Sequence, residues 1–165
     1  MQSFPEIAFR KANDEDAEFL YGLYAEKRDD EIACFGWSQS ETLSFLKMQF
    51  DLRRKAYEMR YPHAEYRVIQ LSEGPVGEMI VYRTRNLLTL VDITVSGEVR
   101  GRGIGTEAIR RLQNEALEAH SGVVLHVDST NPRAQRLYQR LGFVGTGEPD
   151  QVSIEMRWAR AIQAE

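Results

Sequence analysis

Two stretches in the first third of the chain carry apolar residues at the spacing of an amphipathic helix. The first follows Asn13, a residue suited to a helix N-cap, and begins with acidic residues that the helix dipole favours at that end. The second begins after Ser38, which stands in capping-box spacing to Glu41, and Pro62 is expected to end it. The residues expected on the two buried faces are Phe19, Leu20, Leu23 and Tyr24 in the first helix and Leu43, Leu46, Phe50 and Tyr57 in the second.

After Glu65 the apolar pattern changes to a period of two, which indicates strands. With a short strand at the start of the chain, the strands are predicted over 7–11, 66–71, 76–83, 87–95, 123–127 and 152–158. Short turns separate the second, third and fourth of these, so neighbouring strands there must be antiparallel. Two further helices are predicted over 103–119 and 132–141. The predicted fold is therefore α/β with α+β character: one domain over residues 1–165, with a mixed, mostly antiparallel sheet of six to seven strands and about four helices on its two faces.

Composition narrows the class of protein further. The 165 residues suit one domain, and no repeat or Pro/Gly/Ser-rich linker divides them. The net charge of −4 argues against a nucleic-acid partner, which requires a clustered positive surface. No apolar run approaches the roughly 20 residues of a membrane span, and the amino terminus lacks a signal-peptide pattern. Because Cys34 is the single cysteine, no internal disulfide is expected; we predict a cytoplasmic protein in which Cys34 is structural.

The densest chemical signal is the segment V-R-G-R-G-I-G-T over residues 99–106. It lies between a predicted strand and a predicted helix, where backbone N–H groups and the positive end of the helix can hold phosphate. Its glycines allow positive φ and close approach of a ligand, and Arg100 and Arg102 supply charged donors. The segment therefore predicts a phosphate-binding loop, with a plain glycine-rich turn as the alternative.

Two other phosphate motifs fit this loop less well. A P-loop requires Gly-Lys-Ser/Thr, whereas the last glycine here is followed by Thr-Glu. The dinucleotide fingerprint G-x-G-x-x-A matches residues 103–108, and Asp128 follows a strand at about the expected distance of ~20 residues. Against that fingerprint, seven residues separate Val95 from Gly103, and the preceding strands are predicted to be antiparallel.

The loop resembles the pyrophosphate loop of GNAT N-acetyltransferases, Gln/Arg-x-x-Gly-x-Gly/Ala, with Arg100, Gly103 and Gly105 at its three positions. The segment N-P-R-A-Q-R-L-Y-Q-R-L-G-F over 131–143 is similar to the second signature of that family. The two signatures stand in the family's order and at a family-like separation. The resemblance implies a single GNAT domain with acetyl-CoA as co-substrate and no metal.

The resemblance also implies roles for individual residues. The backbones of Ile93 and Val95 would pair with the pantetheine arm, and the Val95 N–H would polarise the thioester carbonyl. Asn131 would hydrogen-bond the pantetheine or acetyl region, and Tyr138 would be the general acid for the departing thiolate. The residues implied to bind acetyl-CoA are Ile93, Val95, Arg100, Gly101, Arg102, Gly103, Ile104, Gly105, Thr106, Asn131 and Tyr138.

The general base stays open at this stage. Where several family members carry Glu or His, this chain has Thr89, which cannot take a proton from an amine. Asp92 is the nearest ionisable residue on the same strand and is our candidate catalytic base. Strict alternation places it on the opposite face from Ile93, unless a bulge changes its direction. Glu78, Glu31 and a chain of water molecules remain as alternatives.

Residues 29–37, D-D-E-I-A-C-F-G-W, are expected to link the first two helices. In the family this region commonly lines the acceptor pocket, so its acidic residues would attract a cationic amine, and Phe35 and Trp37 would cover the amine's stem. The alternative is a solvated acidic loop with both aromatic residues in the core. The run Arg53-Arg54-Lys55 is interpreted as the solvent face of its helix, with the binding of an anionic substrate as the second interpretation.

The remaining candidates are interpreted as structural. His126 is expected to be a core or edge residue, and His63 and His120 to lie at the surface. No spacing of His, Cys and carboxylates indicates a metal site. The sequence thus favours transfer of an acetyl group from acetyl-CoA, through a tetrahedral intermediate, to a primary amine of a small molecule, peptide or protein. A non-catalytic acyl-CoA-binding regulatory domain and a nucleotide-cofactor domain are the alternatives, and a homodimer is a frequent state in the family.

Overall fold

The structure is a computed structural model and describes residues 3, 5–148 and 152–159. The described residues do not include Met1, Gln2 and Phe4, which belong to the amino-terminal segment where no signal peptide is expected. They also do not include residues 160–165 of the predicted domain. The elements in chain order are β1 (Ala8–Lys11), the 3-10 helix η1 (Asp14–Asp16), α1 (Ala17–Ala33), α2 (Gln39–Arg60), β2 (Glu65–Leu71), β3 (Gly74–Arg83), β4 (Leu87–Val95), the 3-10 helix η2 (Gly97–Val99), α3 (Ile104–Glu118), β5 (Gly122–Asp128), α4 (Pro132–Arg140), β6 (Val144–Gly145) and β7 (Ser153–Ala159).

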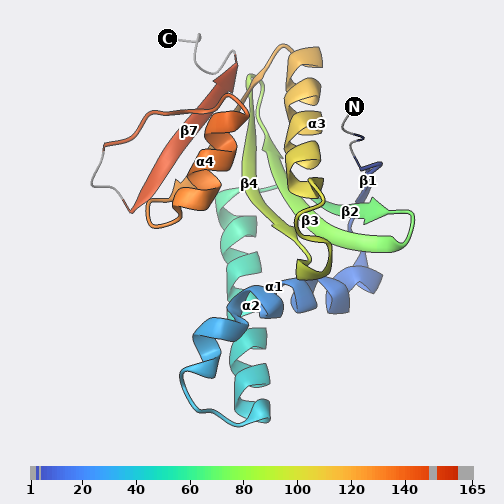
Figure 1. The fold of residues 1–165 in the computed structure, drawn as a ribbon, viewed down its shortest axis with the longest axis vertical. Coiled ribbons are helices and arrows are strands. Elements are labelled where there is room, and N and C mark those ends of the chain that lie inside the picture. Colours follow the sequence, from blue (N-terminus) through green and yellow to red (C-terminus); the bar gives the residue numbers. More distant parts are fainter. Residues whose placement is uncertain (1–2, 4, 149–151, 160–165) are drawn as a thin grey trace.

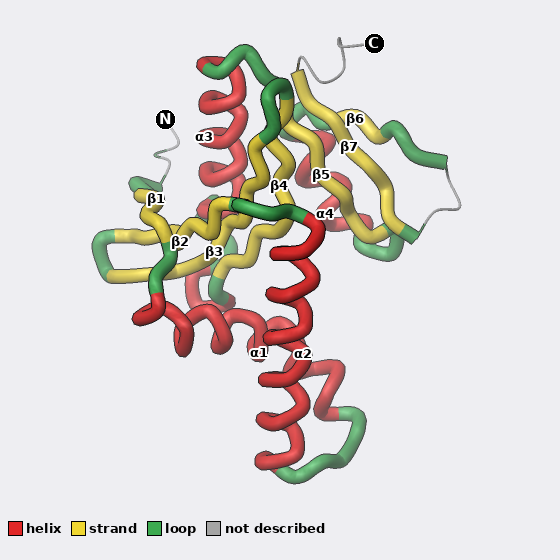
Figure 2. The backbone as a smooth tube through the Cα atoms, turned by 180° about the vertical axis from the view of Figure 1, so that it is seen from behind, coloured by secondary structure: helices red, strands yellow, loops and turns green. Residues whose placement is uncertain are grey.

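The predicted mixed sheet is confirmed. Its strands are arranged in the order β1-β2-β3-β4-β5-β7-β6, and the pair β4–β5 is parallel while the other neighbouring pairs are antiparallel. Helices α1 and α2 cover one face, and α3 and α4 cover the other (Figures 1 and 2). Such a sheet, with one parallel pair, does not form the doubly wound βαβ units of a dinucleotide-binding domain. The two-residue strand β6 was missed, because two residues carry no readable period.

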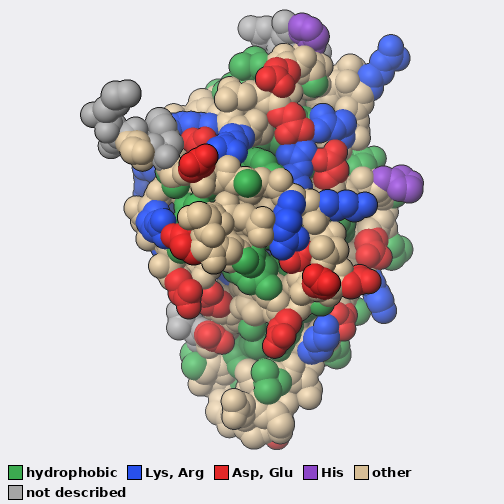
Figure 3. Space-filling model, turned by 90° about the vertical axis from the view of Figure 1, so that its right-hand side faces the viewer, with side chains coloured by type: hydrophobic (Ala, Val, Ile, Leu, Met, Phe, Trp, Pro, Cys, Tyr) green, Lys and Arg blue, Asp and Glu red, His purple; other side chains and the backbone are tan. Residues whose placement is uncertain are grey.

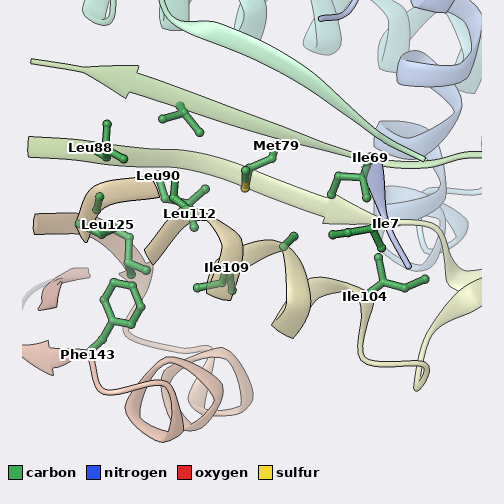
Figure 4. Packing of buried hydrophobic residues seen from close by; sticks show 14 of the residues in the cluster. Ile7, Ile69, Met79, Leu88, Leu90, Ile104, Ile109, Leu112, Leu125 and Phe143 are labelled. Atoms are coloured by element: carbon green, nitrogen blue, oxygen red, sulfur yellow. The ribbon is translucent and has the colours of Figure 1, made fainter. Parts of the chain in front are cut away.

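The main hydrophobic core lies between the sheet and α3. Apolar residues of α3 at helical spacing meet the inward residues of β3, β4 and β5, and Phe143 closes the end of the cluster after α4 (Figure 4). Full burial of each aliphatic side chain contributes about 1.5–3 kcal/mol. The largest buried members include Met79, Leu88, Ile109, Leu112 and Leu125. This core fixes the start of α3 against the end of β4, which is where the glycine-rich loop lies.

The predicted start of α2 is confirmed, whereas Asn13 caps the 3-10 helix η1, which leads directly into α1. The side chain of Asn13 accepts a hydrogen bond from the Glu15 N–H at 2.9 Å, while the Asn13 N–H donates to the Asp16 carboxylate at 2.8 Å. Ser38 and Glu41 form the corresponding capping box of α2. Arg10 donates two hydrogen bonds to Asp16, at 2.6 and 2.7 Å, and these bonds, with the Asn13 N–H, lower the pKa of Asp16 to about 2.

Two expectations for this region were wrong. Helix α1 continues to Ala33, so the first five residues of the predicted 29–37 linker are helical. Leu43, expected on the buried face of α2, is 49% exposed, whereas Leu46 is buried. The amino-terminal part of α2 extends beyond the sheet (Figure 2), so residues there have no sheet to pack against.

The surface has no extended single-sign field on the side shown in Figure 3, where Lys and Arg side chains are interspersed with Asp and Glu. Such a mixture differs from the continuous basic surface that tracks nucleic acid. None of the described helices combines the length and apolarity needed to cross a bilayer.

Candidate functional site

An opening in the sheet defines the site. The parallel pairing of β4 with β5 extends from Leu87 to Leu90, although β4 itself continues to Val95. β5 instead continues alongside β7 as far as Asp128. Among the described residues, the end of β4 over 91–95 therefore has no strand partner on its β5 side. Strand edges of this kind present backbone donors and acceptors to a ligand.

The glycine-rich loop lies at the end of this free edge. Gly101 and Gly103 have φ of +80° and +76°, a conformation that favours glycine, and no atom lies within 4 Å of where a Cβ would stand on either residue. Gly103 is the N-cap of α3 and supplies no side-chain cap. The first N–H groups of α3 therefore point outward without a capping partner, which is the arrangement that binds phosphate at helix starts.

A groove runs from the free edge of β4 past this loop to α4. Five of its lining residues are cationic and none is acidic, although the whole chain carries a net charge of −4. A positive groove beside an uncapped helix start suits a ligand that bears several phosphate groups. The groove is lined by Lys27, Ile93, Thr94, Val95, Arg100, Gly101, Gly103, Ile104, Gly105, Thr106, Ile109, Asn131, Arg133, Ala134, Arg136, Leu137, Tyr138 and Arg140.

The groove contains all but one of the residues that the sequence suggested for binding acetyl-CoA. The exception is Arg102, which is not among the lining residues and lies 3.5 Å from the Glu73 carboxylate. Three arginines of α4, Arg133, Arg136 and Arg140, line the groove and were missed by the sequence analysis. Their spacing of three and four residues was a readable sign that they share one face of the helix.

Asn131 and Tyr138 enter the groove from α4. Asn131 is the N-cap of this helix, because its side-chain oxygen accepts a hydrogen bond from the Ala134 N–H at 3.1 Å. Its side-chain amide N–H groups donate to no other described residue. The Tyr138 ring packs edge-on against Phe143, with the ring centroids 5.8 Å apart. Among the described residues the Tyr138 hydroxyl has no hydrogen-bond partner, although the ring lines the groove.

The electrostatic surroundings of Tyr138 connect it to Asp92. Burial, and then the negative charge of Asp92, raise the pKa of Tyr138 to about 12. Both effects disfavour the phenolate, so the hydroxyl stays protonated throughout the physiological range. The influence of Asp92 also indicates that its carboxylate lies within electrostatic range of the Tyr138 hydroxyl.

A bulge in β4 determines where Asp92 faces. Ile80 pairs with Asp92 while the next residue, Val81, pairs with Leu90, so Val91 is an extra residue in β4. Leu90 and Ile93 both pack toward the core around α3, three residues apart. Asp92 lies on the other face, toward α2, where its carboxylate is 3.4 Å from the Arg53 guanidinium and its side chain is 20% exposed. The possibility of a bulge, raised from the sequence, is thus confirmed.

Asp92 lines a cavity between β3, β4 and the helices α1 and α2. Lys27 and Thr94 line both this cavity and the groove, so the two meet at the end of β4. Glu78 is 8% exposed in the cavity wall and accepts a hydrogen bond from Arg54 at 2.6 Å. Burial raises the pKa of Glu78, while the Arg54 hydrogen bond opposes that rise.

The interpretation of the Arg53-Arg54-Lys55 run as solvent face was therefore wrong for its two arginines. Both line the cavity, and Arg54 lies over the rings of Phe50 and Tyr66, at 5.0 Å from each centroid. The helical spacing of the sequence already indicated that both arginines face the sheet. Positions 50, 53, 54 and 57 share one helix face, and Phe50 and Tyr57 were already expected to be buried.

The acidic and aromatic residues near the α1–α2 connection lie apart from the cavity. Glu31 pairs with Arg28 on the surface of α1 at 2.8 Å. Phe35 stacks on Trp37, and the two side chains are 56% and 41% exposed. Neither aromatic residue lines the cavity, and neither is tucked into the core. The interpretation of both as core residues was therefore wrong, and their contact with an acceptor stays a prediction.

The remaining sequence candidates do not take part in the groove. His63 and His120 are exposed in turns, as predicted, and His126 lies 3.8 Å from the Glu155 carboxylate on the β7 side of β5. Asp128 accepts hydrogen bonds from the N–H and hydroxyl of Thr130, at 2.8 and 2.7 Å. Cys34 is exposed. Within the described part of the chain, no group of three or more His, Cys, Asp or Glu residues is placed to hold a metal ion.

Comparison with known proteins identifies the family. The family model "Acetyltransferase (GNAT) family" matches residues 12–143, most of the chain. The chain therefore belongs to the GNAT acetyltransferase family, whose members are acyl-CoA-dependent N-acetyltransferases. No curated protein matches it.

Solved structures confirm the GNAT fold. The PaiA N-acetyltransferase from Thermoplasma acidophilum, in complex with coenzyme A, has a TM-score of 0.67 at 16% identity, covering 93% of this chain and 98% of that one. A spermidine N-acetyltransferase chimera from Vibrio cholerae and hSSAT has a TM-score of 0.66 at 17% identity, covering 96% and 98%. An acetyltransferase from Thermus thermophilus has a TM-score of 0.65 at 19% identity, covering 92% and 95%.

Proposed function

We propose that the protein transfers the acetyl group of acetyl-CoA directly to a primary amine of a small molecule or peptide. The observation that carries this proposal is the groove, a positive channel that joins a helix start without a side-chain cap to the end of β4. Among the described residues, that end of β4 has no strand partner on its β5 side, and the Tyr138 hydroxyl in the groove has no hydrogen-bond partner. Those three features match the pyrophosphate, the pantetheine amides and the thioester of one elongated ligand. The coenzyme A bound to the Thermoplasma relative supports the same donor.

The donor is held mainly by backbone. N–H groups at the start of α3 and in the loop at Gly101 and Gly103 bind the pyrophosphate, assisted by Arg100. The free edge of β4 pairs with the pantetheine amides as an added strand would, and a Val95 N–H polarises the thioester carbonyl. Asn131 contributes its side-chain amide to the same arm. In this assignment Arg102, paired with Glu73, is an outer contact.

The acceptor enters from the cavity lined by Asp92. Its amine must be uncharged to attack, so a group that takes up a proton is required. Asp92 is the proposed base, because it lies on β4 itself and within electrostatic range of Tyr138. Glu78 is less suited, since Arg54 holds its carboxylate at 2.6 Å. Arg53 lies farther from the Asp92 carboxylate, at 3.4 Å, than Arg54 lies from that of Glu78.

The steps balance in atoms and charge. The amine nitrogen bonds to the carbonyl carbon, the Val95 N–H stabilises the resulting oxyanion, and the amine proton passes to Asp92 directly or through water. The C–S bond then breaks, and the thiolate receives the proton of the Tyr138 hydroxyl. The tyrosine is restored by proton transfer from solvent or from Asp92, and no covalent enzyme intermediate forms.

A thiol-release assay tests the proposal. The protein is supplied with acetyl-CoA and a panel of amino acids, aminoglycosides, peptides and polyamines, including spermidine because one structural neighbour acetylates it. A Cys34→Ser background removes the protein's own exposed thiol from the readout. Amine-dependent release of coenzyme A, with an acetylated product detected by mass spectrometry, supports the proposal. Failure to bind acetyl-CoA, or the absence of release with every amine, contradicts it.

A further inference from the structure

The charges around the acceptor cavity are unequal. Three cationic residues, Lys27, Arg53 and Arg54, line it together with two acidic residues, Glu78 and Asp92. Each carboxylate is matched by one arginine: Arg54 lies 2.6 Å from Glu78 and Arg53 lies 3.4 Å from Asp92. The remaining charge is therefore the ammonium of Lys27. Within the described part of the chain, no carboxylate lies within ion-pair distance of it.

Two acidic residues near Lys27 on α1, Glu26 and Glu31, are engaged elsewhere. The Glu26 carboxylate accepts a hydrogen bond from the Gly97 N–H at 2.6 Å, and Glu31 pairs with Arg28. The Glu26 bond also fixes α1 against the segment that follows β4. This hydrogen bond therefore keeps α1, and Lys27 with it, beside the point where the groove and the cavity meet. Its long side chain can direct its charge into either space.

We propose that Lys27 makes the cavity selective for amines that also carry an anionic group, with a carboxylate as the expected case. In an acceptor of this class, the amine faces Asp92 while its carboxylate pairs with Lys27. Tyr24 and Tyr57 also line the cavity. This inference rests on the proposed function and names its substrate class: amino-acid-like amines are accepted and polyamines are disfavoured.

The physical reason is charge complementarity in a partly enclosed site. A zwitterionic acceptor brings one negative charge to the Lys27 ammonium, which has no ion-pair partner among the described residues, and its carboxylate does not compete with either arginine–carboxylate pair. A polyamine brings additional positive charge to a cavity whose described lining already has one more cationic than acidic residue. Charge-assisted hydrogen bonds are stronger than neutral ones, so loss of the carboxylate is expected to weaken binding by roughly tenfold or more.

Binding of matched ligands tests the inference without requiring turnover. Phenylalanine, phenylalaninamide, phenethylamine, lysine, lysinamide and cadaverine are titrated by calorimetry into protein saturated with free coenzyme A. For the wild type, the carboxylate form of each set is expected to bind about tenfold more tightly than its amide. Lys27→Gln should abolish that difference, while Lys27→Arg, which keeps the charge, should retain most of it. The affinity for coenzyme A is measured for each variant as well, because Lys27 also lines the groove.

Several outcomes overturn the inference while leaving the proposed function in place. These are equal or better binding of the amides or cadaverine, no binding by either carboxylate-bearing amine, or discrimination that survives in Lys27→Gln. A large loss of coenzyme A affinity in Lys27→Gln, with acceptor discrimination unchanged, assigns Lys27 to the donor and also overturns it. If the wild type fails to bind coenzyme A at all, the proposed function fails first, and the saturation step of the titration shows this separately.

Discussion

Replacing Tyr138 by Phe removes the proposed proton donor and keeps the ring. The ring packs against Phe143 and the main core, and the hydroxyl has no partner among the described residues. The fold should therefore lose less than about 1 kcal/mol of stability, because no hydrogen bond is broken. The affinity for acetyl-CoA should stay nearly constant, since the proton is needed only when the thiolate departs.

The size of the catalytic loss follows from the pKa of Tyr138. A phenol of pKa about 12 is a weak acid relative to a thiol of pKa about 8.5, so complete transfer of its proton is uphill by roughly 3.5 units, or about 5 kcal/mol. Tyr138 therefore contributes mainly while the C–S bond is breaking, and its contribution lies at the low end of the range for general acids. We expect kcat and kcat/KM to fall together by roughly 10²-fold, or about 2.7 kcal/mol.

The assay is steady-state thiol release with an accepted amine, compared with calorimetry of acetyl-CoA. Tyr66→Phe is the matched control, because the buried Tyr66 hydroxyl has no hydrogen-bond partner among the described residues and Tyr66 lines neither the groove nor the cavity. Because a general acid with a raised pKa stays protonated up to about pH 12, the wild type should show no loss of rate from this residue between pH 7 and 10. Turnover of Tyr138→Phe at the parental rate refutes the general-acid assignment.

Further predictions concern the loop, the base and the first helix. Gly103→Val should weaken acetyl-CoA binding by about tenfold, as measured by calorimetry. Gly36→Val is the control: Gly36 has φ +64° and is remote from the groove, so this variant carries similar backbone strain but should not weaken binding. Equal effects of the two variants would show that the loop is not part of the site. Arg100→Ala should cost less, about 1–2 kcal/mol of binding energy, and an unchanged dissociation constant would exclude the contact. Asp92→Asn should fold normally and lose kcat/KM most at low pH, where hydroxide cannot replace the base; a pH profile parallel to the wild type would exclude Asp92. Asp16→Asn should lower the free energy of unfolding at pH 7, because a carboxylate whose pKa is lowered in the folded state stabilises the fold at any pH above its unfolded pKa. In urea titrations, the difference between variant and wild type should shrink as the pH falls from about 4 through the folded pKa of about 2. A difference that stays constant with pH would contradict that linkage.

Most of the fold was predictable because its signals are local. The capping residues Asn13 and Ser38 fix the helix starts through hydrogen bonds within a few residues, and the alternation after Glu65 marks strands that are half or fully buried. Short turns then require antiparallel neighbours. The predictions were wrong where the burial of a residue depends on packing between elements that are distant in the sequence. Leu43 has a helical spacing suited to burial, but the sheet does not extend under that part of α2.

The residues of the candidate site also fall into those that local sequence could predict and those that depend on tertiary packing. Gly103 and Tyr138 belong to continuous motifs, so their neighbourhood could be proposed from the sequence. The bulge at Val91 could be raised as a possibility, but its effect on Asp92 depends on pairing with β3. Lys27 gave no signal at all, because its position beside β4 is set by the packing of α1 across the sheet and by the Glu26 bond to Gly97. The α4 arginines and Arg53 could have been predicted from helical spacing, because each shares a helix face with a residue whose position was already predicted.

Thermal unfolding in the presence of acetyl-CoA, free coenzyme A and NAD tests the central claim most directly, because it requires no acceptor. At a concentration near 100 times the dissociation constant, a ligand that binds only the folded state adds about 2.7 kcal/mol and should raise the Tm by roughly 5–10 °C. We expect such a rise with acetyl-CoA and with coenzyme A, a rise that Gly103→Val largely abolishes, and no rise with NAD. No stabilisation by either coenzyme A species, or equal stabilisation by NAD, would contradict it.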